Sequence, residues 1–135
     1  MSNKPYIIDF GKIGSTENGF ISIAHLQNTP FHIQRVYWTY NTPDGVVRGH
    51  HAHKKLHQMI FAVHGNITMH IENEHGVMYK FNLNTPASGL YIPPRHWRTI
   101  EMSNNAVLLC LASEEYNEDD YIRNYDDFKR IRSIN

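Results

Sequence analysis

The chain has 135 residues, 13 basic and 13 acidic side chains that cancel, and one cysteine, Cys110. This length suits a single domain, residues 1–135, and the neutral charge leaves no global field to attract nucleic acid or an anionic membrane. A single cysteine excludes a disulfide within the chain, and neither a signal-like N-terminus nor an apolar run near the roughly 18 residues of a membrane span is present. We expect a soluble cytoplasmic protein with a packed thiol and with no nucleic acid or membrane partner.

The first part of the chain predicts short strands separated by turn residues. Strands are expected where β-branched, aromatic and alternating apolar residues gather, on either side of a Gly-rich loop. They cover 6–10, 20–24 and 31–40, and the loop covers 14–19. A turn cluster from Asn41 to Gly45 then leads into a histidine-rich segment.

That segment, Arg48 to Gly65, holds five of the ten histidines. His51, His53 and His57 are at odd spacing, so an extended strand would place the three imidazoles on one face. The segment then becomes apolar and stops at a glycine, as a strand does when it enters a core and ends in a turn. We therefore expect a functional site where the strand enters the core.

The second part of the chain predicts a meander of strands followed by one helix. The expected strands are 67–71, 77–83, 90–92, 97–102 and 106–112, with a hairpin turn at 72–76. From Asp119 on, apolar residues recur at steps of three and four, which is typical of a helix packed on the outside of a barrel. About nine strands and one helix indicate an all-β jelly roll or barrel of antiparallel strands with a short C-terminal helix.

The histidine segment resembles the first cupin motif in the spacing of Gly45, His51, His53, Gln58 and Gly65. Metal-binding members of that superfamily carry glutamate where Gln58 stands, and Thr99 falls about where their second motif has histidine. Metal sites of this kind need three or four converging nitrogen, oxygen or sulfur donors. We therefore expect no metal and no other cofactor.

Four segments in order resemble the sugar 3,4-ketoisomerases that act on thymidine-diphosphate-linked 4-keto-6-deoxyglucose, the WxcM-like proteins. They are 30–37, 48–56, 89–92 and 120–129. The resemblance implies a homodimer that binds a nucleotide sugar. It also implies an isomerase that moves the keto group from C4 to C3 in the biosynthesis of 3-amino deoxysugars.

Such a reaction removes the C3 proton, passes through an enediolate and returns a proton to C4, so it needs a base and donors for the oxyanion. We predict that His51 transfers the proton. Its partner His53 either orients it, polarises an oxygen or shuttles protons between O3 and O4. The substrate-binding residues that the resemblance implies are Arg48, Arg35, Tyr37, Arg98 and Asn18, with Arg35 or Arg48 on the diphosphate.

Two positions bear on the product. In the ketoisomerases that this chain resembles, the C4 configuration tracks residues that correspond to Asn18 (or Glu17) and Arg98. Arg98 resembles members that yield the gluco-configured 3-keto sugar, whereas Asn18 matches neither pattern, which leaves the configuration open. The alternative functions are a related sugar-nucleotide epimerase, a cupin that binds nucleotide sugars without turnover and, third, a metal-dependent cupin.

Overall fold

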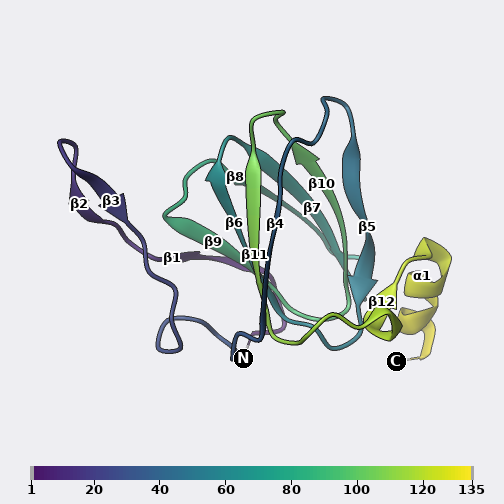
Figure 1. Ribbon diagram of the computed structural model, residues 1–135. Coiled ribbons are helices and arrows are strands. Elements are labelled where there is room, and N and C mark those ends of the chain that lie inside the picture. The colour runs from purple at the N-terminus through teal and green to yellow at the C-terminus, as the bar shows by residue number, and fades with distance from the viewer. Residues whose placement is uncertain (1, 135) are drawn as a thin grey trace.

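The computed structural model describes residues 2–134 and places two five-stranded antiparallel sheets face to face (Figure 1). The order in the first sheet is β1 (Tyr6–Asp9), β9 (Ser88–Ile92), β6 (Gln58–His64), β11 (Val107–Ala112) and β4 (Arg35–Thr39). The order in the second is β12 (Tyr121–Ile122), β5 (Val47–His53), β10 (His96–Met102), β7 (Ile67–Asn73) and β8 (Met78–Leu83). The expected cupin or jelly-roll barrel is confirmed.

The hydrophobic core lies between the two sheets because strand residues alternate between the inner and outer faces. Its centre is built from fully buried side chains of both sheets, among them Ile60, Met69, Ile71 and Leu90. Cys110 is buried in the same cluster, and burial raises the pKa of its thiol to about 11. The expectation of a packed thiol is confirmed.

A third, small sheet stands apart from the barrel. β2 (Ile13–Ser15) and β3 (Gly19–Ile21) form a hairpin that projects away from the two sheets (Figure 1). The sequence predicted a loop at 14–19, and that prediction was wrong because a turn of only three residues, 16–18, lets both flanks pair. The strand expected at 31–40 is also shorter, since Pro30 and the residues after it run as irregular chain before Arg35. The described residues form twelve strands rather than nine.

The C-terminal helix begins later than the apolar periodicity indicated. Residues 118–122 form a 3₁₀ turn, η1 (Glu118–Asp120), and the strand β12, and only then does α1 (Tyr125–Ile134) begin. The helix packs on the outside of the second sheet, where Phe128 is buried with Ala52 and Ile122. This packing fixes β12 along β5, with Tyr121 opposite His53. No helix among residues 2–134 is long and apolar enough to cross a membrane.

Candidate active site

A β-bulge in β5 decides which of its side chains face inward. In a regular strand, Arg48 and His51 would point to opposite faces because they are three residues apart. The pairing of β5 with β10 shifts register here, and residues 49 and 50 have positive φ angles of 90° and 53°. Arg48 therefore joins His51 on the wall of one cavity, while His50 lines a different surface outside the barrel.

Glycine is required at this bulge by a close approach of the two backbones. A Cβ atom on Gly49 would lie 2.9 Å from the carbonyl oxygen of Arg98. The left-handed φ of Gly49 is also costly for any other residue. The sequence Arg48-Gly49-His50-His51 is thus a structural unit that turns an arginine and a histidine toward the same cavity.

The cavity has a volume of about 490 Å³ and opens between the two sheets beside β4, β5 and β12. Apolar side chains, including Ile100, Met102 and Leu108, form part of its lining. Its polar wall includes one imidazole, three guanidinium groups, three phenol rings and one hydroxyl, from His51, Arg35, Arg48, Arg123, Tyr37, Tyr116, Tyr121 and Thr39. This size and this cationic, aromatic lining suit a ligand that carries a sugar and a negatively charged group.

The hydrogen bonds of His51 fix its tautomer. Its Nδ1 lies 2.9 Å from the carbonyl oxygen of Gly49, which can only accept, so Nδ1 carries the proton and donates. Nε2 then keeps its lone pair and can accept a proton. Burial, and next the positive charge of Arg98, lower the pKa of His51 to about 4. His51 is therefore neutral at neutral pH, with the Nε2 lone pair available to accept a proton.

His53 is oriented by a buried carboxylate. Its Nδ1 donates to the Oδ2 of Asp120 at 3.1 Å, and the Oδ1 of Asp120 accepts the N–H of Lys55 at 2.8 Å. Burial, followed by the charge of Arg98, lowers the pKa of His53 to about 2. The His53 ring meets the His51 ring edge to face, with 4.9 Å between centroids, and packs on Tyr121 at 4.4 Å. The buried His53 ring thus packs against the His51 ring on the side away from the cavity and helps to fix its position.

Among residues 2–134, Arg98 is a buried cation without a carboxylate in ion-pair distance. Its side chain is 1% exposed, and its Nη1 and Nη2 donate to the Gln58 amide oxygen and the His96 carbonyl oxygen. Both acceptors are neutral, and Nε is buried with no hydrogen-bond partner in the described part of the chain. Such a charge costs stability. Because it lies where it lowers the pKa of both imidazoles, it also provides a fixed positive field at the site.

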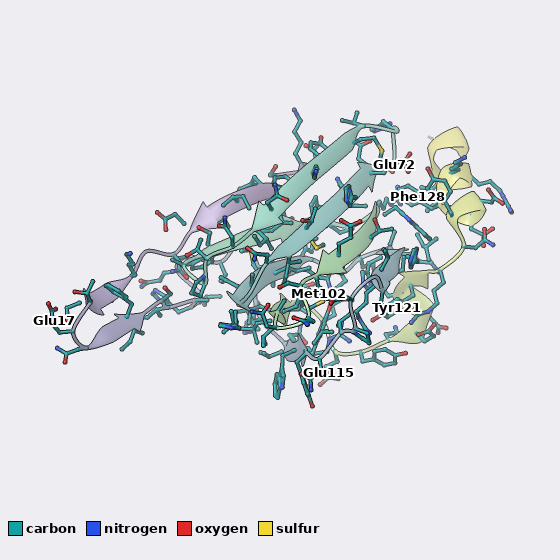
Figure 2. The ribbon with its side chains drawn as sticks, turned by 90° about the horizontal axis from the view of Figure 1, so that it is seen from above. Glu17, Glu72, Met102, Glu115, Tyr121 and Phe128 are labelled. Atoms are coloured by element: carbon teal, nitrogen blue, oxygen red, sulfur yellow. The ribbon has the colours of Figure 1, made fainter. Side chains whose placement is uncertain are left out.

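The residues predicted from the sequence fall into three groups. His51, Arg48, Arg35 and Tyr37 line the cavity together. His53 and Arg98 are buried behind the wall rather than on it. Asn18 and its neighbour Glu17 lie in the exposed turn of the β2–β3 hairpin, and Figure 2 shows Glu17 at the opposite end of the molecule from Tyr121.

His57 does not share a face with His51 and His53, so that prediction was wrong. Residues 54–57 interrupt the expected strand and carry the chain from β5 in one sheet to β6 in the other. His57 bonds the hydroxyl of Tyr91 instead, with 2.7 Å between Nδ1 and the oxygen.

Besides Tyr116, which also lines the cavity, three residues of the site in the segment 120–129 were missed by the sequence analysis. They are Asp120, which holds His53, and Tyr121 and Arg123, which line the cavity. The Arg123 guanidinium lies 4.1 Å from the centroid of the Tyr121 ring and bonds Glu118. The segment 120–129 resembles the ketoisomerases and could have indicated these residues. The sequence analysis instead assigned its acidic and aromatic residues to the helix.

Among residues 2–134, no three His, Cys, Asp or Glu side chains are grouped as a metal site requires. The Gln58 oxygen, which would be a donor, already accepts from the Arg98 cation. Metal-independent turnover stays a prediction. We expect dialysis against a strong chelator to leave the rate unchanged, whereas a loss that one divalent metal restores would contradict it.

Two facing antiparallel sheets with a histidine- and arginine-lined cavity at one end define a cupin-type small-molecule site. A family model described as "FdtA: WxcM-like, C-terminal" matches residues 3–133. The chain belongs to this family.

Named relatives agree with that assignment. The chain is 39% identical over 137 residues to a TDP-4-oxo-6-deoxy-alpha-D-glucose-3,4-oxoisomerase of Aneurinibacillus thermoaerophilus, a match that covers 100% of this chain and 96% of the relative. It is similar in structure to QdtA, a sugar 3,4-ketoisomerase of Thermoanaerobacterium thermosaccharolyticum in complex with TDP. The TM-score is 0.92 and the identity 34%, covering 99% and 98% of the two chains. A histidine-to-asparagine variant of QdtA in complex with TDP-4-keto-6-deoxyglucose matches with a TM-score of 0.91 and 34% identity over 99% and 97%.

Proposed function

We propose that this protein isomerises TDP-4-keto-6-deoxyglucose to the 3-keto sugar, as a step in the formation of 3-amino deoxysugars. The observation that carries the proposal is the neutral His51 on the wall of a cationic cavity, in a chain 39% identical to a 3,4-oxoisomerase. Both sheets share one core, which supports a single domain. The unpaired buried thiol of Cys110 supports a cytoplasmic place of action.

The first step is removal of the C3 proton by Nε2 of His51. The C3–H electron pair forms the C3=C4 double bond, and the carbonyl electrons move onto O4, which gives an enediolate. The fixed charge of Arg98 and the hydroxyl of Tyr37 stabilise the developing oxyanion. Burial raises the pKa of Tyr37 well above its usual value, so this hydroxyl stays protonated and can donate.

The second step returns the proton. The O3 proton passes to O4, the electrons of O3 form the new C3 carbonyl, and the His51 imidazolium gives its proton to C4. Atoms and electrons balance without an oxidant or reductant. The substrate's diphosphate adds negative charge near Arg48 and Arg35, which raises the pKa of His51 above its value of about 4 in the free protein. That brings the base closer to the pH at which it works best.

The direct test of this function is the product. The purified protein is incubated with TDP-4-keto-6-deoxyglucose, and the sugar carbons are followed by NMR. We expect the carbonyl carbon to move from C4 to C3. A 4-keto sugar with an inverted C3 or C5 centre would indicate the epimerase alternative, and an unchanged sugar that binds tightly would indicate a binding protein without turnover.

The diphosphate is assigned to two arginines of the cavity wall. The Arg35 guanidinium lies over Tyr37 and Tyr116, with its central carbon 5.4 and 5.7 Å from their ring centroids. Its buried Nε has no hydrogen-bond partner among the residues that the structure describes. Arg48 lies across the cavity on β5. An unsatisfied buried donor and a second cation are what a diphosphate would satisfy.

Replacing Arg35 or Arg48 with alanine should chiefly weaken nucleotide binding. We expect each change to cost about 1 to 3 kcal/mol in TDP affinity, measured by titration calorimetry, because a charge-assisted hydrogen bond is lost. Lys80→Ala removes a cation from β8, which contributes no residue to this cavity, and serves as the control. Unchanged TDP affinity in both arginine variants would place the diphosphate elsewhere.

The proposal includes a homodimer formed through the β2–β3 hairpin. Ile13, Phe20 and Ile21 on this hairpin are 64%, 48% and 63% exposed, and a two-stranded hairpin is only marginally stable alone. Beside it, an apolar groove of about 650 Å³ crosses the outer face of the first sheet. A second copy that packs here would cover both. Contact between Asn18 and a bound sugar would then occur in the partner's cavity.

The replacement Phe20→Asp should convert the dimer to a monomer, because it places a charge in an apolar interface. Light scattering after size exclusion measures the mass. Met78→Asp, at a residue 66% exposed on β8, is the matched control and should stay dimeric. A monomeric wild type, or a variant that remains a dimer, would contradict this assembly.

A further inference from the structure

The side chain of Gln58 ties together the two groups that act on the oxyanion. It is 1% exposed at the start of β6 and reaches Arg98 on β10 of the facing sheet and Tyr37 on β4 of its own sheet. Its Oε1 accepts from Nη1 of Arg98, and its Nε2 lies 3.0 Å from the hydroxyl oxygen of Tyr37. None of the four sequence segments that resemble ketoisomerases contains this residue.

The donor inventory leaves the amide only one orientation. A guanidinium has donors and no acceptor, so the oxygen of Gln58 must face Arg98. The NH₂ group must then face Tyr37, whose oxygen accepts. The hydroxyl proton of Tyr37 is therefore not used by Gln58. Its neighbour inside the core is the sulfur of Cys110, a weak acceptor that an oxyanion in the cavity lined by Tyr37 would outcompete.

The Gln58 amide is uncharged, so it bonds Arg98 without neutralising the positive charge of the guanidinium. The other acceptor of Arg98, the carbonyl of His96, is also neutral. A glutamate at position 58 would fit the same space, yet it would pair with Arg98 and cancel the field at the imidazoles. Its second oxygen would have to accept from the Tyr37 hydroxyl, which would consume that proton.

We propose that Gln58 is a positioning residue for the isomerisation: its uncharged amide leaves the charge of Arg98 uncompensated, and its NH₂ group leaves the Tyr37 proton to be donated to the oxyanion rather than to position 58. This inference rests on the proposed function for the reaction itself. The arrangement of charge that it describes exists without substrate and can be tested without turnover.

The charge-sensitive reporter is His51. Charged or titratable groups surround His51 from β10, β5, β4 and the C-terminal segment. Arg98, Arg123 and Glu118 act on its pKa, the rings of His53 and Tyr121 contact its ring, and Arg35, Arg48, Tyr37 and Tyr116 line the same cavity. Of these, Arg98 has the largest electrostatic effect on the pKa of His51, second only to burial. Neutralising the charge of Arg98 with a nearby carboxylate should therefore raise the pKa of His51.

The experiment compares Gln58→Glu with Gln58→Met in the full chain. Gln58→Glu keeps both hydrogen bonds and adds a charge, so we expect a folded protein with a melting temperature no lower than that of the wild type. Its kcat should fall roughly 100-fold or more with little change in KM, as for the loss of an oxyanion donor. The acid limb of the kcat/KM profile, which is the pH range in which activity is lost on acidification as His51 is protonated, should move to a pH about one unit higher.

Gln58→Met keeps the volume and adds no charge. Its kcat should fall because Arg98 and Tyr37 are no longer held, while the acid limb stays near that of the wild type. Asn82→Asp, the same amide-to-carboxylate change on the exposed face of β8, is the control and should alter neither quantity. Wild-type kcat in either Gln58 variant, or lower kcat in Gln58→Glu without a shift of the acid limb, would overturn the proposal.

NMR titration of the His51 ring in the resting protein separates this proposal from the proposed function. We expect the pKa of His51 to rise in Gln58→Glu and to stay near its wild-type value in Gln58→Met. If the pKa of His51 rises in Gln58→Glu but the wild type shows no isomerase turnover, the electrostatic role of Gln58 stands and the proposed isomerisation is rejected. An unchanged His51 titration in a folded Gln58→Glu variant would reject the role of Gln58, whatever the reaction.

Discussion

His51→Asn should slow turnover by roughly 100- to 10,000-fold, the usual cost of losing a general base. Asparagine keeps a side chain of similar polarity and can still bond the Gly49 carbonyl, but it has no lone pair that takes a proton at neutral pH. The diphosphate is assigned to arginines, so TDP affinity should stay within about twofold. Steady-state kinetics and titration calorimetry measure the two quantities.

His50→Asn is the matched control. The same change is made one residue earlier, where the backbone has a φ of 53° that asparagine tolerates well and the side chain faces away from the cavity. Its turnover should match the wild type. Equal losses in the two variants would point to damage of the bulge rather than removal of a base.

Arg98→Met should lower kcat by roughly 100- to 1,000-fold, because a fixed positive charge aimed at the oxyanion is lost. It should also change the pH profile in a defined direction. The charge of Arg98 lowers the pKa of His51, so its removal raises that pKa from about 4 toward 6.5, although burial still holds it down. Activity should therefore be lost at a higher pH as the solution is acidified.

The control for this variant is Arg95→Met. Arg95 is on the surface, paired with Glu74 at 3.3 Å, and its removal should change neither kcat nor the acid limb. The acceptors that the structure gives the buried Arg98 are neutral, so its replacement by an apolar chain of similar length strands no carboxylate and should not unfold the protein. Wild-type kcat in Arg98→Met would refute the electrostatic role of this residue.

The sequence was sufficient to predict the barrel and the face of β5 that carries His51 and His53. Strand alternation depends on local pattern, which a single chain displays directly. The inward position of Arg48 could not be derived from alternation, because it depends on the bulge at Gly49 and His50. A bulge is created by pairing with β10, and pairing is invisible in one strand.

The hydrogen-bond partners of His53 and Arg98 were also hard to predict, because they too depend on contacts between distant parts of the chain. Asp120 is 67 positions from His53, and Gln58 is 40 from Arg98, so neither partner is marked by spacing. The stripe from Tyr121 to Ile131 favoured a helix throughout, but pairing of Tyr121 with His53 outweighs that periodicity. Tertiary contacts, not propensity, place Asp120 and Tyr121 in the site.

The measurement that tests the central claim most directly is isomerisation in deuterated water. The keto sugar nucleotide is incubated with wild type, with His51→Asn and without protein, and early time points are analysed by NMR. The wild type should give a 3-keto product with deuterium at C4 and recovered substrate with deuterium at C3, well above the protein-free sample. His51→Asn should match the protein-free sample. Deuterium incorporation by His51→Asn at the wild-type rate would contradict the assignment of His51 as the proton-transfer residue.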